Sequence, residues 1–567
     1  MECKDQPIGT LHFLRKEENK MKKMIALLLV LVMVFALCAC GAKTEAPKTE
    51  EKKEETSAPG KTEEKKEETA APEDNGEPKV LRVAFRGDPN SLCHVITAVG
   101  SANTPAHQLI MDRLFEFDYT TNTAIPMLAT GWEAVDGTHY RVTLRDDVYS
   151  WNGDKFTAND VVYTVKSAID SGVHGRYYGN FDIDNFVVES DTSLIMALKK
   201  ADPFIQTTLC NIPYGMLVQA SVEAGGGLEK MEGKDGTMPN CYTGPYIPVE
   251  WSTGAYVKFV RNDNYWGGTP YFDEVIINSI ADATSRTEAL EAGDIDLVLE
   301  PAESQVPLIE GNPDLAIASY PTTNYHTLFT NVQTAPFDDV NVRIACALAL
   351  DYTNNIKIAL GGFASHSDDI LPIGNPMYAS PADEGYESFY TYNVELAKEY
   401  MAKSKYAGTN PTVKILYTPQ HEAYIPLIQQ QWKEIGIDVQ PEPIAQSAFY
   451  STIAEGTSQS WIVNNSNPNP YEQLKFYDGE HFTYKDLNGG PGWNGGAEVT
   501  ALYDEITSIP VLEDAREQYK ALRKIINQNV PSIPLFTPDR LAFCVSNLDG
   551  LILTSVGDLN FSKAFMN

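Results

Sequence analysis

The chain has 567 residues, of which 77 are acidic and 44 are lysine or arginine, and its formal net charge at pH 7 is -33. A charge of that sign argues against nucleic acid and against an anionic lipid surface as partners. The length is enough for two or three lobes that share hydrophobic cores.

A leader segment opens the chain. Residues 21–23 carry positive charge, and Ile25–Leu37 is an unbroken apolar run. The run has the length typical of a secretion signal and is too short to span a bilayer comfortably, which takes about 20 apolar residues. It ends in Leu-Cys-Ala-Cys-Gly, an order around Cys40 that resembles the lipobox of bacterial lipoproteins. The resemblance implies that residues 21–39 are a signal peptide and that Cys40 is acylated, which anchors the protein to the outer face of a membrane.

Residues 40–78 are expected to form a disordered tether. The segment contains KTEEKKEET twice, at Lys48–Thr56 and at Lys61–Thr69, and four prolines interrupt it. Like charges four residues apart repel one another on a helix, and few apolar side chains are present for burial. A flexible coil of this length reaches on the order of 35 Å. Residues 1–20 resemble neither a signal nor a domain, so we expect Met21 to be the true start.

The folded body begins at about Lys79 and alternates helix and strand patterns. Thr157 and Asp160 have the spacing of a capping box before an apolar helix face. Residues 282–298 predict a helix that ends at Gly293 and leads into a strand. Residues 413–440 read as strand, helix and strand, which implies a crossover between parallel strands. These signals define an α/β class with mixed sheets.

The cysteines and histidines do not define a chemical centre. Five cysteines remain in the body, so at least one thiol is expected to be free, and Cys346 in a helical pattern is the first candidate. The spacing leaves open the pairing of the other four, which are Cys93, Cys210, Cys241 and Cys544. The nine histidines form no zinc-binding motif, and there is no Gly-x-Ser-x-Gly elbow. We therefore predict a protein that is not an enzyme, with no catalytic residues, no metal site and no cofactor.

Four longer strings occur in order along residues 124–540. They are AIPMLATGWEAVDGTHYRVTLRDDVYSWNGDKFTANDVVYTVKSA (124–168), TGPYIPVEW with YVKFVRNDNYWGGTPYFDEVII (243–277), APFDDVNVRIACALALD (335–351) and VPSIPLFTPDR (530–540). Together they resemble the family 5 extracellular solute-binding proteins, the oligopeptide-, dipeptide- and nickel-binding components of ABC importers.

The resemblance implies a periplasmic-binding-protein-like fold of type II, with two lobes and an additional subdomain in lobe I. Lobe I takes residues 79–325 and 527–567, with the subdomain at about 115–190, and lobe II takes residues 326–526. The hinge strands are then expected near Tyr325–Asn331 and Asn527–Pro534. Tyr265 and Trp266 are expected to pack a core under a turn rather than to contact ligand.

The implied function is that of a membrane-anchored solute-binding component of an ABC importer, facing the extracellular or periplasmic side. It captures oligopeptides by lobe closure and delivers them to permease subunits, and we expect it to act as a monomer. The alternatives are the same role for an oligosaccharide, an opine or a nickel chelate, and a cell-surface receptor that does not transport its solute.

The string WIVNNSNP at 461–468 bears on the ligand. Peptide-binding members carry a string of the type Trp-x-Ala-Asp-Tyr, whose aspartate pairs with the α-ammonium of the peptide, and Asn464 falls at that position. Losing one partner of a buried ion pair costs about 2–5 kcal/mol, which exceeds a factor of ten in affinity. The ammonium therefore needs another acceptor, such as Asp88 or Asp478, or the ligand is an uncharged, hydroxyl-rich solute.

The candidate ligand-binding residues follow from these two alternatives. Amide side chains suit a neutral solute, and a tryptophan offers a stacking surface; equally, the asparagines can cap turns. Asp88 and Asn90 follow the first strand, where open α/β sheets place ligands, and Tyr325 lies beside the inferred crossover. The complete candidate set is Asp88, Asn90, Tyr325, Trp461, Asn464, Asn465, Asn467 and Trp493.

Overall fold

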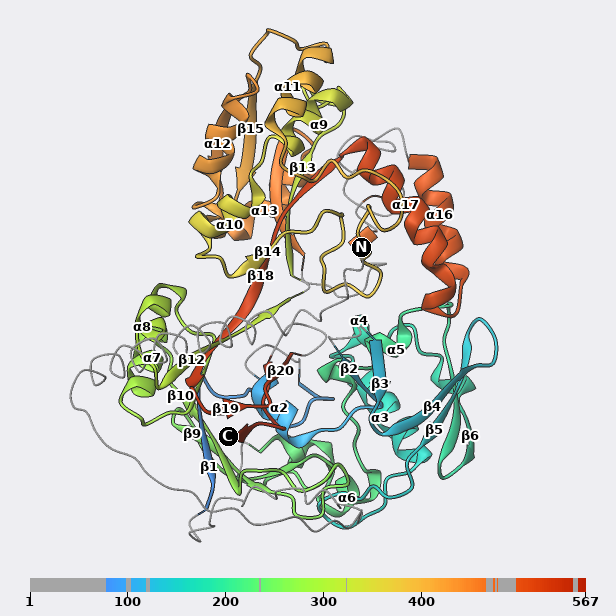
Figure 1. The fold of residues 1–567 in the computed structure, drawn as a ribbon. Helices are drawn as coiled ribbons and strands as arrows, with labels where there is room; N and C mark the ends of the chain where they lie inside the picture. Colours follow the sequence, from blue (N-terminus) through green and yellow to red (C-terminus); the bar gives the residue numbers. More distant parts are fainter. Residues whose placement is uncertain are drawn as a thin grey trace, which may run out of the picture. The chain divides into compact units, whose positions relative to one another are not determined.

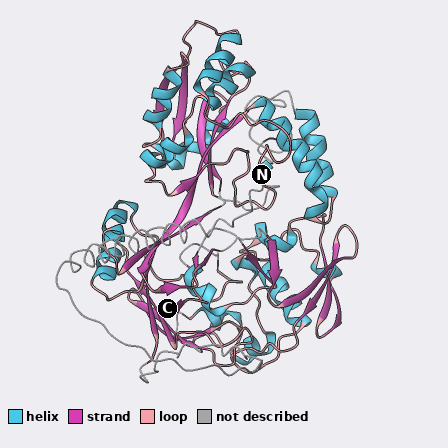
Figure 2. Cartoon of the chain, viewed as in Figure 1, coloured by secondary structure: helices cyan, strands magenta, loops and turns pink. Residues whose placement is uncertain are grey.

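The computed structural model describes residues 78–97, 103–118, 123–233, 236–322, 324–465, 473, 474, 477, 496–553 and 559–567. The chain divides into two compact units, 1–77 and 78–567, and all described residues belong to the second. Figures 1 and 2 show a mixture of helices and strands in this unit. Within the described ranges, no helix has the length and apolar character needed to cross a membrane.

A mixed sheet of twelve strands is the main element of the unit (Figure 1). Its longest strand, β18 (Ser532–Val545), pairs with β13 (Tyr325–Thr330) through its first residues and with β12 (Leu315–Pro321) through its last. The remaining strands, in order across the sheet, are β16 (Asp438–Pro443), β15 (Thr412–Tyr417), β17 (Ser460–Asn465), β11 (Leu297–Leu299), β1 (Val80–Phe85), β10 (Glu274–Ser279), β9 (Tyr256–Arg261) and β8 (Tyr246–Ser252), with β14 (Ala364–Ser365) also paired to β18.

The strands around β1 form the first part of the sheet. β10, α7 (Ala283–Glu291) and β11 make a crossover, and both strands lie parallel to β1. The helix begins where the Asp282 side chain accepts from the backbone N–H of Ser285, and Gly293 with φ 78° follows its end. The predicted helix and following strand are therefore confirmed. Apolar side chains of β1 and β10, among them Leu81, Val83 and Val275, are buried in the first hydrophobic core.

The strands around β15 form the second part. β15, α12 (Ile425–Lys433) and β16 make the predicted crossover between parallel strands. The helix buries Trp432, whose indole N–H donates to the carbonyl of Cys346 on α9 (Val340–Leu348) at 3.0 Å. α17 (Arg516–Asn529) packs Leu522 and Ile526 into the same second core. The two parts of the sheet thus have separate cores and share β18.

A smaller antiparallel sheet belongs to the first core. It contains β4 (Ala129–Ala134), β5 (His139–Leu144), β7 (Ser193–Ala197) and β6 (Val187–Ser190) in that order. α3 (Ala158–Ser171) begins with the predicted capping box, formed by Thr157 and Asp160. β7 completes this sheet by pairing with both β5 and β6. It follows residue 190, which is the approximate end that we predicted for the extra subdomain.

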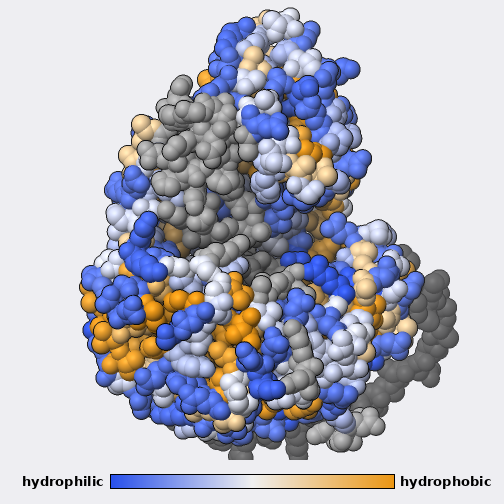
Figure 3. Space-filling view, turned by 180° about the vertical axis from the view of Figure 1, so that it is seen from behind, coloured by the Kyte–Doolittle hydropathy of each residue, from blue (hydrophilic) through white to orange (hydrophobic). Residues whose placement is uncertain are grey.

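The remaining helices and strands are short for the most part. They are α2 (Thr104–Ile110), α4 (Gly175–Tyr178), α5 (Ile205–Thr208), α6 (Gln219–Ala224), α8 (Val306–Glu310), α10 (Tyr352–Ala359), α11 (Val394–Lys403), α13 (Gln446–Ala454), α16 (Gly496–Ser508), β2 (Phe115–Asp118), β3 (Thr123–Pro126), β19 (Leu548–Asp549), β20 (Ile552–Leu553), β21 (Leu559–Asn560) and β22 (Phe565–Met566). Figure 3 shows one face of the molecule, where hydrophilic residues predominate and hydrophobic ones gather in the lower half of the view.

The five cysteines of the body are all buried, and none of them forms a disulfide with another described cysteine. Cys346 lies on α9 with no exposed surface, as the helical pattern predicted. Burial raises the pKa of the Cys346 thiol well above its usual range, because the thiolate is poorly solvated there. The open question of pairing among the other four is answered by the absence of any disulfide between described cysteines.

The change of partner along β18 lies further along the chain than the expected hinge segment Asn527–Pro534. Ser532, Ile533, Pro534 and Phe536 pair with β13, and pairing with β12 begins at Asp539. Ile533, Leu535 and Phe536 belong to the second core. The start of β18 is therefore fixed by packing, and the change of partner falls at Thr537 and Pro538.

Candidate ligand-binding site

The large sheet contains two groups of parallel strands, one on each side of β18. β15 and β17 form one group, and β1, β10 and β11 form the other. β15 and β17 are parallel, and β18 runs in their direction because both β17 and β18 are antiparallel to β13. β1, β10 and β11 are parallel to one another. Ligands of open α/β sheets bind beyond the carboxyl ends of such strands. Each group therefore offers a candidate half-site.

The first half-site, called the β11 edge, consists of Arg86, Glu300 and Arg540. Glu300 directly follows β11 and has a φ of 50°. A positive φ at a residue other than glycine is strained and is often found at functional positions. The Arg286 guanidinium, which donates to the Glu300 carbonyl at 2.6 Å, holds this backbone in place. The sequence folds so that a carboxylate projects from the end of a buried strand.

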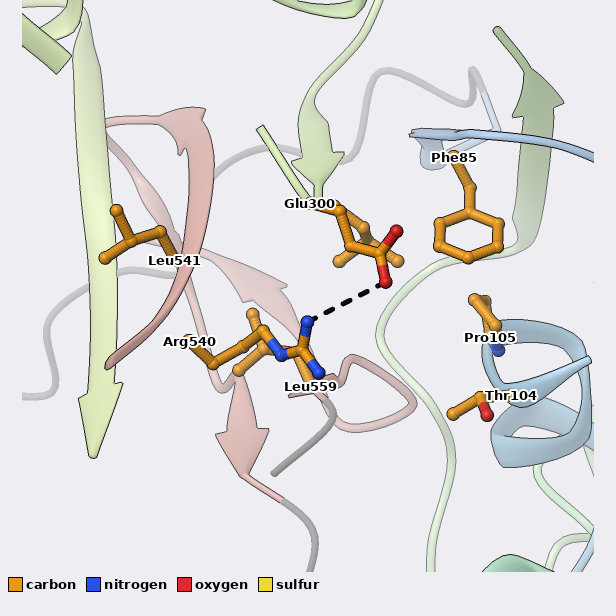
Figure 4. Close-up of a pocket in the computed structure, with 8 residues that line it drawn as sticks. Phe85, Thr104, Pro105, Glu300, Arg540, Leu541 and Leu559 are labelled. Carbon is orange, nitrogen blue, oxygen red and sulfur yellow. Dashed lines mark ion pairs between the residues drawn. The ribbon is translucent and has the colours of Figure 1, made fainter. Parts of the chain in front are cut away.

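The β11 edge combines one carboxylate with two cations. Glu300 lies 3.3 Å from Arg86 Nε and 3.7 Å from Arg540 Nη1, and its side chain is 26% exposed. Figure 4 shows Glu300 and Arg540 facing each other across a cavity that Phe85, Thr104 and Leu559 also line. The cavity has a volume of about 20 Å³, room for a water molecule. Exposed ion pairs of this kind contribute little stability.

The second half-site, called the β17 edge, consists of His326, His421, Asn464 and Phe536. His326 Nδ1 and His421 Nε2 are 2.9 Å apart, and His421 Nδ1 lies 3.2 Å from Thr418 Oγ1. The His326 ring stacks on Phe536 with the centroids 4.5 Å apart. The two imidazoles are thus held by one hydrogen bond to each other and by an aromatic neighbour.

The histidines of the β17 edge are neutral at pH 7. Burial lowers the pKa of His326 to about 3 and that of His421 to about 4, because the imidazolium form loses its hydration. Proximity of the two rings lowers the pKa of His326 further. One neutral ring donates its N–H and the other accepts it. The polar groups of the histidines at the β17 edge are therefore uncharged and buried, in contrast to the partly exposed charges of the β11 edge.

The predicted residues of β17 have different surroundings. Asn464 is half-buried and lies opposite His326 in the pairing of β13 with β17. Trp461 is 2% exposed and stacks on Phe329 with the ring centroids 6.0 Å apart. It packs in the second core and presents almost no surface for a ligand to stack on. Asn465 is placed by its backbone opposite Tyr325, which is itself buried.

Asp88 and Asn90 lie in the turn after β1. The Asp88 carboxylate accepts from the backbone N–H of Gly254, from the Trp251 indole N–H and from the Ser279 hydroxyl. These donors occupy the carboxylate and tie the turn to the end of β10. The exposed Asn90 donates its backbone N–H to the Asn103 side chain. Cys40, Asn467, Asp478 and Trp493 lie outside the described residues.

Sequence analysis missed Glu300, Arg540 and the histidine pair. His326 and His421 are 95 residues apart in the chain, so no spacing motif connects them. Glu300 could have been found from the sequence, because it is an acidic residue directly after the strand that was predicted to follow Gly293. Phe536 and Arg540 stand four residues apart on β18, a separation of about 13 Å along a strand. A solute of several residues can therefore reach both edges.

Comparison with known proteins defines the class. A model of the bacterial extracellular solute-binding proteins, family 5 middle, matches residues 123–485. The match covers more than half of the chain, and the chain belongs to this family, as the four sequence strings predicted. Its fold is the predicted two-lobed α/β class of these binding proteins. The protein is accordingly a solute-binding component of an ABC importer and not an enzyme.

The names of individual relatives refer to different solutes, among them heme and oligopeptides. Heme-binding protein A of Haemophilus influenzae is 26% identical over 77% of this chain and 83% of its own. The probable ABC transporter periplasmic-binding protein SapA of Escherichia coli is 25% identical over 80% and 86%, and the oligopeptide-binding protein AppA of Bacillus subtilis is 24% identical over 83% and 88%. The structure of HbpA2 from Haemophilus parasuis matches with a TM-score of 0.73 at 20% identity, covering 86% of this chain and 100% of that one.

Proposed function

We propose that the protein captures oligopeptides between the β11 edge and the β17 edge and delivers them to a membrane permease. The observation that carries this proposal is Glu300 between Arg86 and Arg540 at the end of β11. A free peptide has an ammonium at one end and a carboxylate at the other. The β11 edge has groups that can pair with either charge, so one charged end of a peptide can bind there while the peptide extends towards the β17 edge, and one of the relatives is an oligopeptide-binding protein.

Glu300 takes the role that Asn464 cannot perform. Asn464 is neutral and lies beside the neutral His326, so the β17 edge holds no anion for a peptide ammonium among its four residues. Asp88 already accepts from three donors. Glu300 is partly exposed, and its ion pairs with the arginines are of the weak, solvent-accessible kind. Exchanging an arginine for a ligand ammonium therefore costs little.

Closure is proposed to bring the two edges onto the solute. In this proposal lobe I takes residues 79–325 with 527–567, and lobe II takes residues 326–526, apart from the start of β18, which packs with the second core. Bending then occurs where β18 changes partner at Thr537 and Pro538 and where β12 leads into β13. Solute that contacts both lobes shifts the population to the closed form, which the permease recognises.

Ligand screening tests the peptide assignment. We expect di- to pentapeptides to raise the melting temperature of the protein, since ligand at a hundredfold excess over its dissociation constant adds about 2.7 kcal/mol to stability. Nα-acetylated copies of the same peptides should bind more weakly, and Glu300→Gln should remove that difference. Stabilisation by oligosaccharides, opines or nickel chelates alone would replace the peptide with that solute and leave the family unchanged.

Anchoring through a lipid on Cys40 is the second element of the proposal, and it rests on the sequence around that residue. Full-length protein in a bacterial host should partition with membranes and incorporate labelled fatty acid. Cys40→Ser should remove the label and release the protein from the membrane fraction, whereas Cys38→Ser is the matched control and should change neither. Label on the Cys40→Ser protein would reject the anchor.

A further inference from the structure

A second cavity lies in the part of the molecule that belongs to the first core. Its volume is about 450 Å³, within the range of small-molecule sites. α2, β3, the segment 265–271 and the C-terminal residues 560–565 contribute to its lining. None of its lining residues lines the cavity at the β11 edge. It is therefore distinct from the half-site that contains Glu300.

Aromatic side chains of this cavity are held in place by a buried carboxylate. Asp112 has no exposed surface and accepts from Trp266 Nε1 at 2.7 Å, from Thr243 Oγ1 at 2.8 Å and from the Tyr265 hydroxyl at 3.0 Å. These donors use three of the roughly four acceptor positions of the Asp112 carboxylate. The aromatic wall is consequently rigid, and Asp112 is a positioning residue for that wall rather than a partner for a ligand.

Two other buried polar side chains of the lining have unused hydrogen-bonding atoms. Gln108 on α2 is 2% exposed, and neither atom of its amide group has a partner among the described residues. Arg113 is 3% exposed, and its Nε likewise has none. Both residues line the cavity. A buried polar atom without a partner is costly, and native proteins pair most such atoms, so a molecule bound in the cavity would gain by supplying this pairing.

Two acidic and two basic side chains line the cavity, and among these four Arg113 has a buried side-chain N–H without a partner in the described part of the chain. Glu116 is paired with Lys563 at 2.7 Å, and Asp112 accepts from three neutral donors, while burial raises the pKa of its carboxyl and Arg113 is near enough to act to lower it. That leaves the Arg113 guanidinium, a planar donor that suits a carboxylate. Gln108 can donate to one ligand oxygen and accept from a neighbouring N–H or O–H. Tyr265, Trp266 and Tyr271 supply flat surfaces for an aromatic body.

We propose that this cavity is a second binding site, separate from the transport site, for a small aromatic carboxylic acid. Its carboxylate binds Arg113 and Gln108, and its ring lies against the aromatic wall. The site belongs to one lobe only, so its occupation does not require lobe closure.

Calorimetry with a matched pair of probes tests the site. Indole-3-acetate carries the carboxylate, and indole-3-acetamide has the same shape without the charge. We expect the full chain to bind the acid at least about tenfold more tightly than the amide. Equal affinity for the two probes, or no binding of either at millimolar concentration, overturns the proposal.

Variants then locate the binding. Gln108→Leu should weaken indole-3-acetate at least about tenfold and should raise the melting temperature of the empty protein, because it removes two unpaired buried atoms. Gln219→Leu on α6 is the matched control, since the Gln219 amide bonds Glu223 on the surface, and it should change neither quantity. Glu300→Gln should also leave the acid bound. Loss of binding in Glu300→Gln with retention in Gln108→Leu assigns the acid to the transport site and overturns the proposal.

Discussion

The β11 edge and the β17 edge differ in the kind of polar group they hold: the β11 edge has charged side chains, and the β17 edge has neutral ones. At the β11 edge a carboxylate and two guanidinium groups remain partly exposed, with side-chain exposures of 26% for Glu300, 46% for Arg86 and 34% for Arg540. At the β17 edge two buried imidazoles are neutral and bonded to each other. A charged group that is to exchange one ion-pair partner for another remains in contact with water. A polar group can be buried when its hydrogen bonds within the protein are satisfied.

The largest expected effect contrasts a buried arginine with an exposed one. Arg523 on α17 bonds Asp369 at 2.8 Å and Glu384 at 2.6 Å, and its side chain is 2% exposed. Arg523→Met leaves two carboxylates without their cation, and we expect it to lower the free energy of unfolding by about 3–5 kcal/mol. Arg540→Met at the β11 edge should cost less than about 1 kcal/mol. Urea denaturation followed by circular dichroism measures both, and equal losses would remove the contrast.

The next effect is a pH dependence that belongs to the β17 edge. In the folded chain the pKa values of His326 and His421 are lowered to about 3 and about 4, against about 6.5 for an unfolded histidine. The unfolded chain therefore binds more protons below pH 6.5, so stability falls as the pH drops from 6.5 towards 4. For the pair the loss is on the order of 2–5 kcal/mol.

Urea unfolding at pH 7, 6 and 5 measures this loss. His94, His107 and His366 are also buried with lowered pKa values and give a slope of the same sign. The informative quantity is thus the difference between parent and variant. His326→Phe preserves an aromatic ring against Phe536 and should flatten the slope, whereas Glu300→Gln should keep the slope of the parent. Identical slopes in all three proteins would mean that the pair does not titrate as described.

A smaller expected effect is the salt dependence of peptide affinity, which tests the charged groups of the β11 edge. Screening shortens the Debye length from about 10 Å at 0.1 M to about 3 Å at 1 M salt, and exposed charges feel this most. A free peptide that uses Glu300 and the arginines should therefore bind several-fold more weakly at 1 M than at 0.1 M sodium chloride. The same peptide with both ends blocked should be nearly insensitive to salt. Calorimetric titrations at the two concentrations distinguish these cases.

Local patterns predicted much of the fold, and long-range pairing explains what they missed. The crossovers through α7 and α12 were predictable because cap, helix period and glycine stop lie within some twenty neighbouring residues, as at Asp282 and Gly293. The change of partner on β18 was not, since it depends on which core Phe536 enters. The family was recognisable because its strings extend along the whole body.

The candidate site was less predictable for the same physical reason. Trp461 was proposed as a stacking surface from its sequence neighbours, yet strand pairing places it opposite Phe329 in the core. Asp88 was a reasonable acceptor in the sequence, but its donors come from residues 163–191 positions away. Whether a polar side chain is available to a ligand depends on such distant partners. Single-sequence patterns do not contain that information.

The smallest expected effect comes from Asp88 and tests this reasoning directly. Asp88→Asn retains an acceptor oxygen for Gly254, Trp251 or Ser279, and it removes a charge that is already engaged. We expect it to change the affinity for free-amine peptides by less than about twofold, while Glu300→Gln lowers that affinity about tenfold because it removes the proposed partner of the ammonium. Parallel calorimetric titrations of the two variants with one peptide give the ratio. If Asp88→Asn lowers the affinity more than Glu300→Gln does, the peptide ammonium binds at the turn after β1 instead. Loss of a carboxylate charge should lower the affinity strongly only where the ligand pairs with that carboxylate.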